Sequence, residues 1–198
     1  RSRFTSTHTA GVAETSFILA QLLGLDTDHC RKIRLAGYLH DLGKLAVPRE
    51  ILDKPLGLDH REHSLMKSHA YFTRRILESV DVFSEVAVWA SHHHEKLDGT
   101  GYPRRLTGAD LSIPERIMAI ADIFEALTAS DRPYKQAKTL SESIGIMSFM
   151  CKDGHICPDL FALFLRSGVY LDYARAFLSP EQIDAVDVAQ YLGAAGKA

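Results

Sequence analysis

The sequence predicts an all-α protein, a bundle of about seven or more helices. Apolar residues recur every three or four positions in successive segments, which is the spacing of helices with one buried face. No alternation of apolar and polar residues extends beyond a few positions, so a β-sheet is not expected. The 198 residues, 46% of them hydrophobic, are sufficient for one well-buried domain.

The first two predicted helices carry residues that are suited to binding a metal. One helix covers residues 4–23 and includes His8 in its first third. The next covers residues 30–42 and brings His40 and Asp41 to the end of an apolar stretch. Because a carboxylate has two oxygens, Asp41 is able to bridge two ions while each histidine binds one.

Two further helices are expected over residues 59–79 and 82–92. The first is polar at its start, apolar later, and carries His69. The second contains the only tryptophan, Trp89. Four histidines of the chain have no neighbours that point to a shared site, so we expect them at the surface: His29, His60, His63 and His155.

The helix over residues 82–92 runs directly into three consecutive histidines and a glutamate. The second and third of these histidines, His93 and His94, are candidate metal ligands. We interpret His92 as a residue of the helix end. Imidazole nitrogens are common ligands of transition metals, and adjacent histidines place two of them close together.

An irregular segment, residues 96–112, separates these helices from the next one. At its centre, Asp98-Gly99-Thr100-Gly101-Tyr102-Pro103 contains two glycines and a proline, which exclude a continuous helix and predict a tight loop. Pro114 then begins a helix with Asp122 inside its apolar run. An ionised carboxylate there is costly unless it is paired or bound to a metal, and both interpretations are open at this point.

The C-terminal part of the chain carries no motif. After a helix-breaking segment at 131–135, further helices are expected over residues 140–151, 158–167 and 180–191. The segment is compatible with helical packing, a homodimer face or a cover over the site. We therefore expect one domain of residues 1–198, with a metal-binding core at about 4–135 and C-terminal helices at about 139–192.

The candidate ligands form a set that suits two metal ions. They are His8, His40, Asp41, His69, His93, His94 and Asp122. If Asp41 bridges, the set provides about four protein bonds to each of two octahedral ions and leaves positions for a shared hydroxide and substrate oxygens. Such an open pair suits hydrolysis of a phosphoester. The absence of thiolates from the set favours iron, manganese or nickel over a structural zinc site.

Composition excludes several other classes of protein. The net charge of −2 argues against a general nucleic-acid or membrane-surface binder. No apolar run reaches the roughly 18 residues of a membrane span, and no signal peptide opens the chain. The three cysteines have no Cys-x-x-Cys spacing and are expected to be reduced thiols of a cytosolic protein. Near the ligands, Lys44, Arg132 and Lys135 would add positive charge for a phosphate.

In its motifs the chain closely resembles the HD-GYP family, a branch of the HD superfamily of metal-dependent phosphohydrolases that hydrolyses cyclic di-GMP in bacteria. The motifs occur in the same order and with similar gaps: His40-Asp41 with Gly43-Lys44, His93-His94-Glu95, Asp98-Gly99-Thr100-Gly101-Tyr102-Pro103, Ala121-Asp122 and Arg132-Pro133-Tyr134-Lys135. The match runs from Phe4 to Lys135. A His-Asp pair or a Gly-Tyr-Pro sequence alone is weak evidence, whereas the whole set in register is strong.

The resemblance implies a role for each matching residue. The first metal would be held by His8, His40 and Asp122 and the second by His69, His93 and His94, with Asp41 shared. Lys44 would face the substrate or the leaving oxygen, Arg132 and Lys135 the phosphates, and Tyr102 would shape a loop beside the site. The expected activity is a cyclic di-GMP phosphodiesterase that yields the linear dinucleotide and, after a second cut, GMP. The catalytic residues would be Asp41 and Lys44.

One departure from the family limits the number of ions. Some members hold a third metal with a glutamate one helical turn before the first ligand histidine, and Phe4 stands there in this chain. We therefore predict two divalent ions, iron or manganese first and nickel second. His69 is followed by Ala70 where a proline is common, which changes the local backbone but not the ligand.

Other functions stay open beside cyclic di-GMP hydrolysis. Relatives act on cyclic GMP-AMP, and a catalytically weak sensor or docking module would bind the dinucleotide or a partner protein through the Gly-Tyr-Pro loop. The resemblance implies a diguanylate-cyclase or adaptor protein as that partner, a cytoplasmic bacterial location, no DNA binding, and a homodimer as one arrangement. Because the first residue is Arg1 rather than methionine, we expect a piece of a longer regulatory protein.

Overall fold

The computed structural model describes residues 3–54, 57–129 and 138–192, with side chains from His8 onward. Ten α-helices and three 3₁₀ helices occur in these ranges, and no β-strand does, which confirms the all-α prediction. The α-helices are α1 (Arg3–Leu22), α2 (Thr27–Leu39), α3 (Arg49–Leu52), α4 (His60–Leu77), α5 (Ser84–Ser91), α6 (Ile113–Thr128), α7 (Leu140–Lys152), α8 (Pro158–Arg166), α9 (Val169–Phe177) and α10 (Val188–Leu192). The 3₁₀ helices are η1 (Leu42–Ala46), η2 (Asp81–Phe83) and η3 (Pro180–Gln182). No helix of the described residues has the length and apolar character that a membrane span requires.

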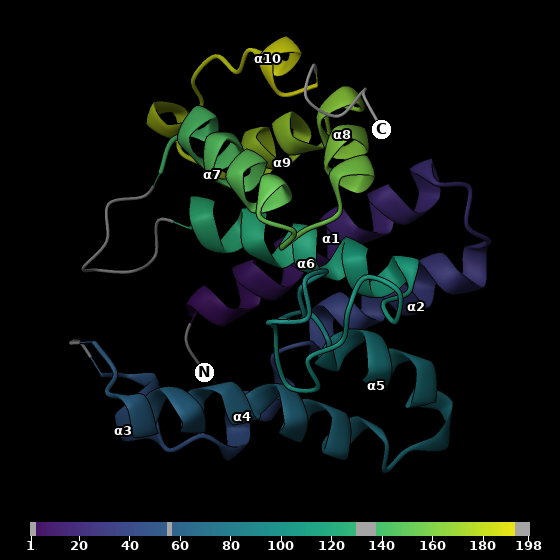
Figure 1. Ribbon diagram of the computed structural model, residues 1–198, viewed down its shortest axis with the longest axis vertical. Helices are drawn as coiled ribbons and strands as arrows, with labels where there is room; N and C mark the ends of the chain where they lie inside the picture. Colours follow the sequence, from purple (N-terminus) through teal and green to yellow (C-terminus); the bar gives the residue numbers. More distant parts are fainter. Residues whose placement is uncertain (1–2, 55–56, 130–137, 193–198) are drawn as a thin grey trace.

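Helix α6 lies at the centre of the bundle. It packs against α1, α2 and α5 on one side and against α7 and α8 on the other (Figure 1). Ile117, Ile120 and Phe124 are fully buried, and most other positions of the helix are buried too. A helix that is apolar on nearly all sides belongs inside a core, and this position lets α6 place polar side chains deep in the protein.

Helix α2 ends earlier than the sequence predicts. Asp26 caps its N-terminus, but the helix stops at Leu39 instead of continuing to residue 42, and η1 follows. Thr73 of α4 explains this end, because its hydroxyl donates to the His40 carbonyl (2.9 Å) and accepts from the Gly43 N–H (2.9 Å). The side chain thus satisfies backbone groups that the helix end leaves free. His40 and Asp41 consequently lie in a turn and not on one helix face.

The C-terminal helices differ from the prediction in two places. Helix α9 was not predicted, although Val169, Tyr170, Tyr173 and Ala174 are buried at helical spacing. The helix predicted over residues 180–191 is wrong, since the chain forms only η3 and the short α10 there. Tertiary contacts outweigh helix propensity in this stretch. Gln182 donates to the carbonyls of Thr128 and Lys138, and Asp184 accepts from Ser141.

Gly43 provides a test of the packing between η1 and α4. A β-carbon at this position would lie 2.0 Å from the His69 carbonyl oxygen and 2.4 Å from the Thr73 nitrogen, both of them backbone atoms. We expect Gly43→Ala to lower stability by about 3 kcal/mol or more, a fall in Tm of at least roughly 6 °C. Gly57→Ala is the matched control, because a β-carbon there meets nothing within 4 Å. Equal melting of both variants in circular dichroism would contradict this account.

Candidate metal centre

The structure brings all seven predicted ligands together from separate parts of the chain. Each comes from a helix or from the residues that directly follow one: His8 from α1, His40 and Asp41 from the turn between α2 and η1, His69 from α4, His93 and His94 from the end of α5, and Asp122 from α6. Six of the side chains, all except that of Asp122, fall into two groups, each with ligand atoms within 4.8 Å of one another. One group is His8, His40 and Asp41, and the other is His69, His93 and His94.

Asp41 belongs to the first group and also faces a histidine of the second. Its Oδ2 is 3.6 Å from His8 Nε2 and 3.6 Å from His40 Nε2, whereas its Oδ1 is 3.5 Å from His69 Nε2. The two oxygens of one buried carboxylate therefore face different groups of histidines. This arrangement suits a carboxylate that binds one ion through each oxygen.

Asp122 is the second carboxylate at the boundary. Its Oδ1 is 3.5 Å from His8 Nε2 and 3.6 Å from His40 Nε2, which places it with the first group. Its Oδ2 lies 3.8 Å from His94 Nδ1 of the other group. Of the two interpretations that the sequence left open, the geometry excludes a salt bridge to Lys or Arg among the described residues.

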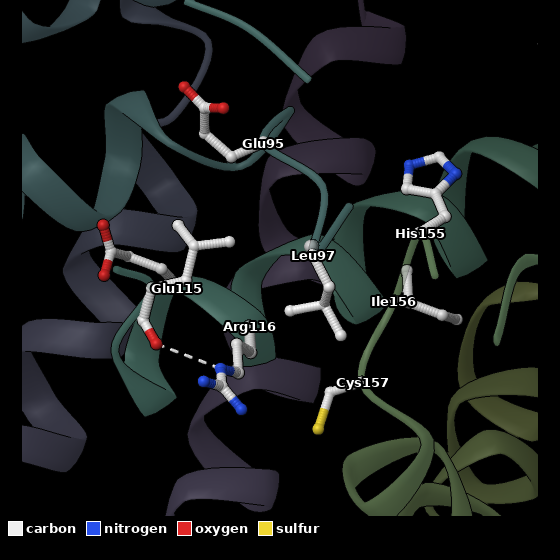
Figure 2. A pocket seen from close by; sticks show the side chains of 9 residues that line it. Glu95, Leu97, Glu115, Arg116, His155, Ile156 and Cys157 are labelled. Carbon is white, nitrogen blue, oxygen red and sulfur yellow. Dashed lines mark hydrogen bonds between the residues drawn. The ribbon is translucent and has the colours of Figure 1, made fainter. Parts of the chain in front are cut away.

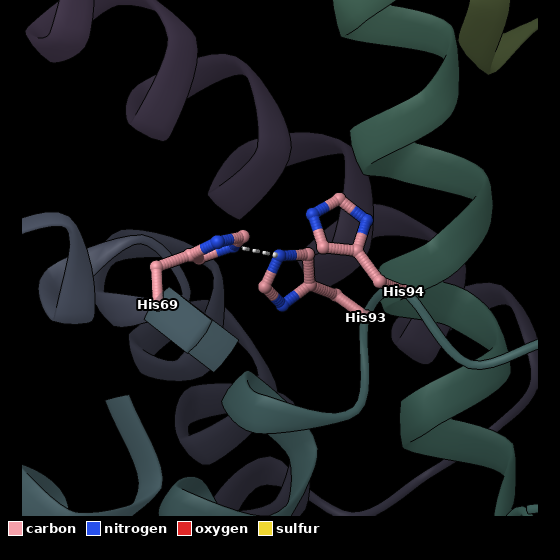
Figure 3. Close-up of side chains that lie close together, drawn as sticks. All are labelled: His69, His93 and His94. Carbon is pink, nitrogen blue, oxygen red and sulfur yellow. Dashed lines mark hydrogen bonds between the residues drawn. The ribbon is translucent and has the colours of Figure 1, made fainter. Parts of the chain in front are cut away.

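The histidine rings are oriented by hydrogen bonds from Nδ1. In three of them this nitrogen donates to the carbonyl three residues earlier: His40 to Gly37 (2.8 Å), His69 to Met66 (2.6 Å) and His93 to Ala90 (2.6 Å). Nε2 is then left with its lone pair directed into the cluster, as a metal ligand requires. Figure 3 shows the rings close together, that of His69 coming from α4 and those of His93 and His94 from the residues after α5. His69 Nε2 and His93 Nε2 are 3.4 Å apart.

Burial keeps several of these rings uncharged. Burial lowers the pKa of His69, His93 and His94, that of His94 to about 4, although Asp122 opposes the shift at His94. Neutral imidazoles bind a metal without first losing a proton. Burial would also raise the pKa of Asp41, but His40 and Lys44 hold it well below its usual range. Neutral imidazoles beside ionised carboxylates fit divalent cations, and no cysteine is part of either group.

Lys44 lies beside Asp41 as well. Its ammonium is 2.5 Å from Asp41 Oδ2, the oxygen that also faces His8 and His40, and its side chain is 40% exposed. Lys44 belongs to η1, so the same turn that positions the carboxylate positions the amine. A half-exposed cation at the edge of a buried cluster is able to contact a phosphate group that binds there.

The loop between α5 and α6 folds back over the second group of histidines. Tyr102 donates its N–H to the His94 carbonyl (3.2 Å), and the centroid of its ring lies 4.7 Å from that of His94. The Lys67 ammonium lies over the Tyr102 ring, 5.2 Å from its centroid. Burial raises the pKa of the Tyr102 hydroxyl. The structure thus places Tyr102 beside the candidate metal centre, where the resemblance implies a loop, and its contact with substrate stays a prediction.

Glu95 holds this loop, a role that the sequence alone did not reveal. Its buried carboxylate accepts the N–H of Arg104 (2.6 Å) through one oxygen and that of Leu106 (2.9 Å) through the other. Gly101 passes close to the same residue, since a β-carbon there would lie 2.5 Å from Glu95 Cα. The position of Glu95 directly after His94 was the available signal, but its partners are nine and eleven residues away.

The other histidines are only partly as predicted. His92 lies at the C-terminal end of α5 and outside both groups, and its Nδ1 bonds to the buried carboxylate of Glu115.

His60 and His63 are exposed. His29 has the surface position that we expected, with 45% of its side chain exposed, whereas the prediction is wrong for His155, which is partly buried. His29 bonds to Asp26 and lies near the Trp89 ring, and His155 lines a cavity.

Figure 2 shows the residues that line this cavity, and none of them is a candidate metal ligand. Its lining includes Leu97, Arg116, His155, Ile156 and Cys157. The volume of about 10 Å³ is at the lower limit for a single water molecule, so no substrate fits there. Arg132 and Lys135, the other predicted phosphate contacts, lie outside the described residues.

Comparison with known proteins agrees with this geometry. The HD domain family matches residues 1–160. The chain belongs to the HD domain family. The resemblance that the motifs indicate is therefore confirmed.

Curated relatives of this HD domain include enzymes for two cyclic dinucleotides. The chain is 41% identical to the 3′3′-cGAMP-specific phosphodiesterase 1 of Vibrio cholerae, over 84% of this chain and 38% of that protein. It is 38% identical to a cyclic di-GMP phosphodiesterase of Pseudomonas aeruginosa, over 84% of this chain and 40% of the relative. It is 37% identical to the cyclic di-GMP phosphodiesterase response regulator RpfG of Xanthomonas campestris, over 72% of this chain and 38% of that protein. The chain thus spans 38 to 40% of the length of these relatives.

From the position of Asp41 between histidines of both groups, we expect the variant Asp41→Asn to bind less metal. Asp41→Asn keeps the size of the side chain but replaces two charged oxygens with one neutral oxygen, so ions next to either group of histidines lose a ligand. We expect the metal content after loading with Mn(II) and desalting, measured by mass spectrometry, to fall from about two ions per chain to one or fewer. Asp53→Asn, an exposed aspartate, should leave it unchanged. Full metal content in Asp41→Asn would exclude a shared carboxylate.

The two hydrogen bonds of the Glu95 carboxylate predict that the loop opens more often when this charge is removed. In Glu95→Gln one of the two backbone N–H groups faces an amide nitrogen and loses its acceptor, which costs about 1–3 kcal/mol. Trypsin should then cleave after the exposed Arg104 and Arg105 roughly 5 to 150 times faster. Asp110→Asn changes an exposed carboxylate of the same loop and should have a much smaller effect. Unchanged cleavage in Glu95→Gln would show that the carboxylate does not hold the loop.

Proposed function

We propose that this HD domain is a metal-dependent phosphodiesterase that hydrolyses a cyclic dinucleotide. The observation that carries the proposal is the position of Asp41, whose two oxygens face two separate groups of histidines. Divalent ions held there would orient a phosphate, lower the pKa of a water molecule and take up charge as the P–O bond breaks. The activities in the names of the relatives support the same reaction class.

The residues of the chain have distinct parts in this proposal. His8, His40 and Asp122 would hold the first ion, His69, His93 and His94 the second, and Asp41 both. Lys44 lies against Asp41 Oδ2 with its side chain 40% exposed, so it is placed to contact a phosphate or the leaving oxygen. Tyr102 would limit access from the side of the second ion, because its ring lies beside His94.

We propose cyclic di-GMP as the substrate, with 3′3′-cGAMP as the second candidate. The curated cyclic di-GMP phosphodiesterases that match the chain come from several bacteria. The second candidate is favoured by identities of 41% and 42% to two 3′3′-cGAMP-specific enzymes of Vibrio cholerae. Both substrates present the same phosphodiester to the metal centre, so their bases decide between them. Iron or manganese, a protein partner at the loop, homodimerisation and a cytoplasmic location stay predictions from the resemblance.

Turnover of three substrates tests the proposal. Protein loaded with Mn(II) or Fe(II) should convert cyclic di-GMP or 3′3′-cGAMP to the linear dinucleotide, with GMP as a later product, and should hydrolyse bis(p-nitrophenyl) phosphate far more slowly. Asp41→Ala should lower kcat/KM at least about 100-fold with the fold retained. Asp53→Ala, an exposed aspartate, serves as the matched control.

Three outcomes would contradict the proposal. Full turnover by Asp41→Ala would remove the shared carboxylate from the mechanism. Tight binding of the dinucleotide without turnover by the metal-loaded protein would favour the sensor or docking module over the enzyme. Equal turnover of the dinucleotides and the generic diester would favour a general phosphodiesterase.

A further inference from the structure

Helix α6 supplies a second carboxylate to the metal centre, behind His8. Glu125 follows Asp122 by three residues, so the two side chains lie one above the other on the same face of the helix. Both are buried. Glu125 bonds to His8 Nδ1, whereas Asp122 lies 3.5 Å from Nε2 of the same ring. One imidazole is thus held between two carboxylates of neighbouring helical turns.

This contact distinguishes His8 from the other histidines of the centre. Nδ1 of His40, His69 and His93 donates to a neutral backbone carbonyl. Nδ1 of His8 faces the carboxylate of Glu125, which has no Lys or Arg partner within 4.0 Å among the described residues. A charged acceptor fixes the proton on Nδ1 more firmly and makes Nε2 a stronger donor to a metal than a neutral acceptor does.

The free side of the His8 ring is directed into the first group. Nε2 lies 3.1 Å from His40 Nε2 and 3.6 Å from Asp41 Oδ2. No corresponding carboxylate bonds to a histidine ring of the second group among the described residues, since His69 and His93 use carbonyls and Asp122 Oδ2 is 3.8 Å from His94 Nδ1. The two candidate ion positions therefore differ, because within the part of the chain that the structure describes only the first has a histidine whose Nδ1 is hydrogen-bonded to a carboxylate.

We propose that Glu125 is a positioning residue that acts through His8 and makes the ion position of His8, His40 and Asp122 the tighter of the two. The inference rests on the proposed metal centre and goes beyond it by ranking the two positions. Loss of such a partner behind a ligand histidine typically lowers metal affinity roughly 10- to 100-fold. Glu125→Gln keeps the size of the side chain and removes its charge.

Variants that keep only one of the two ion positions allow the metal affinity of each position to be measured separately. His69→Gln leaves the first position intact, and His8→Gln leaves the second. Isothermal titration of metal-free protein with Mn(II) should give a lower Kd in His69→Gln than in His8→Gln. Adding Glu125→Gln should raise the Kd roughly 10- to 100-fold in the His69→Gln background and leave it within about threefold in the His8→Gln background, because the residue acts through His8.

Glu115→Gln is the matched control, because Glu115 is a second buried glutamate of α6 that bonds to Nδ1 of a histidine, His92, outside both groups. It should lower Tm without changing either Kd. If Glu125→Gln does not fold, Glu125→Asp, which keeps the charge but shortens its reach, gives the same comparison. Equal weakening in both backgrounds, no weakening in either, or tighter binding in His8→Gln than in His69→Gln would overturn the inference. Because Mn(II) titration needs no turnover, a chain without phosphodiesterase activity can still pass this test.

Discussion

The buried carboxylate of Asp41, whose two oxygens face different histidines, is the constraint on which the rest of the structure depends. It is buried among histidines, with Lys44 as the cation 2.5 Å from it. Taking a carboxylate out of water is costly unless opposite charges or hydrogen-bond donors surround it. Side chains from α1, α4 and α6 therefore have to converge at this point, and α6 lies in the core to reach it. The helices thus surround a polar cluster of histidines and aspartates, and the apolar packing between the helices fixes the positions of these side chains.

Residues around the candidate ligands hold them in place. Thr73 joins the end of α2 to α4 through two hydrogen bonds, and Gly43 allows the two backbones to approach. Glu95 ties the loop to the end of α5. Glu125 supports His8 from α6. Ligands that are locked by such contacts keep their geometry, which a metal centre requires for tight binding and for catalysis.

Sequence reasoning identified the candidate ligands but not the residues that hold them in place. His40-Asp41, His93-His94 and Asp122 are recognisable because short spacings and an anomalous charge in an apolar helix mark them. Glu125 also lies in that helix, but only the fold brings it to His8, 117 residues earlier in the chain. Likewise, the early end of α2 depends on Thr73, 33 residues after His40. Local sequence patterns predict helices and candidate ligands. Where a helix such as α2 ends depends on hydrogen bonds to residues far away in the sequence, which these patterns do not contain.

The central claim is that one carboxylate joins two ions, and magnetic coupling tests it most directly. Electron paramagnetic resonance of the metal-free protein, titrated with Mn(II), distinguishes isolated ions from a pair that shares a bridging ligand. We predict that the spectrum changes from that of an isolated ion to that of an exchange-coupled pair as the second equivalent binds, and that Asp41→Asn never shows the coupled spectrum. A spectrum of uncoupled ions at two equivalents in the wild-type protein would contradict the account.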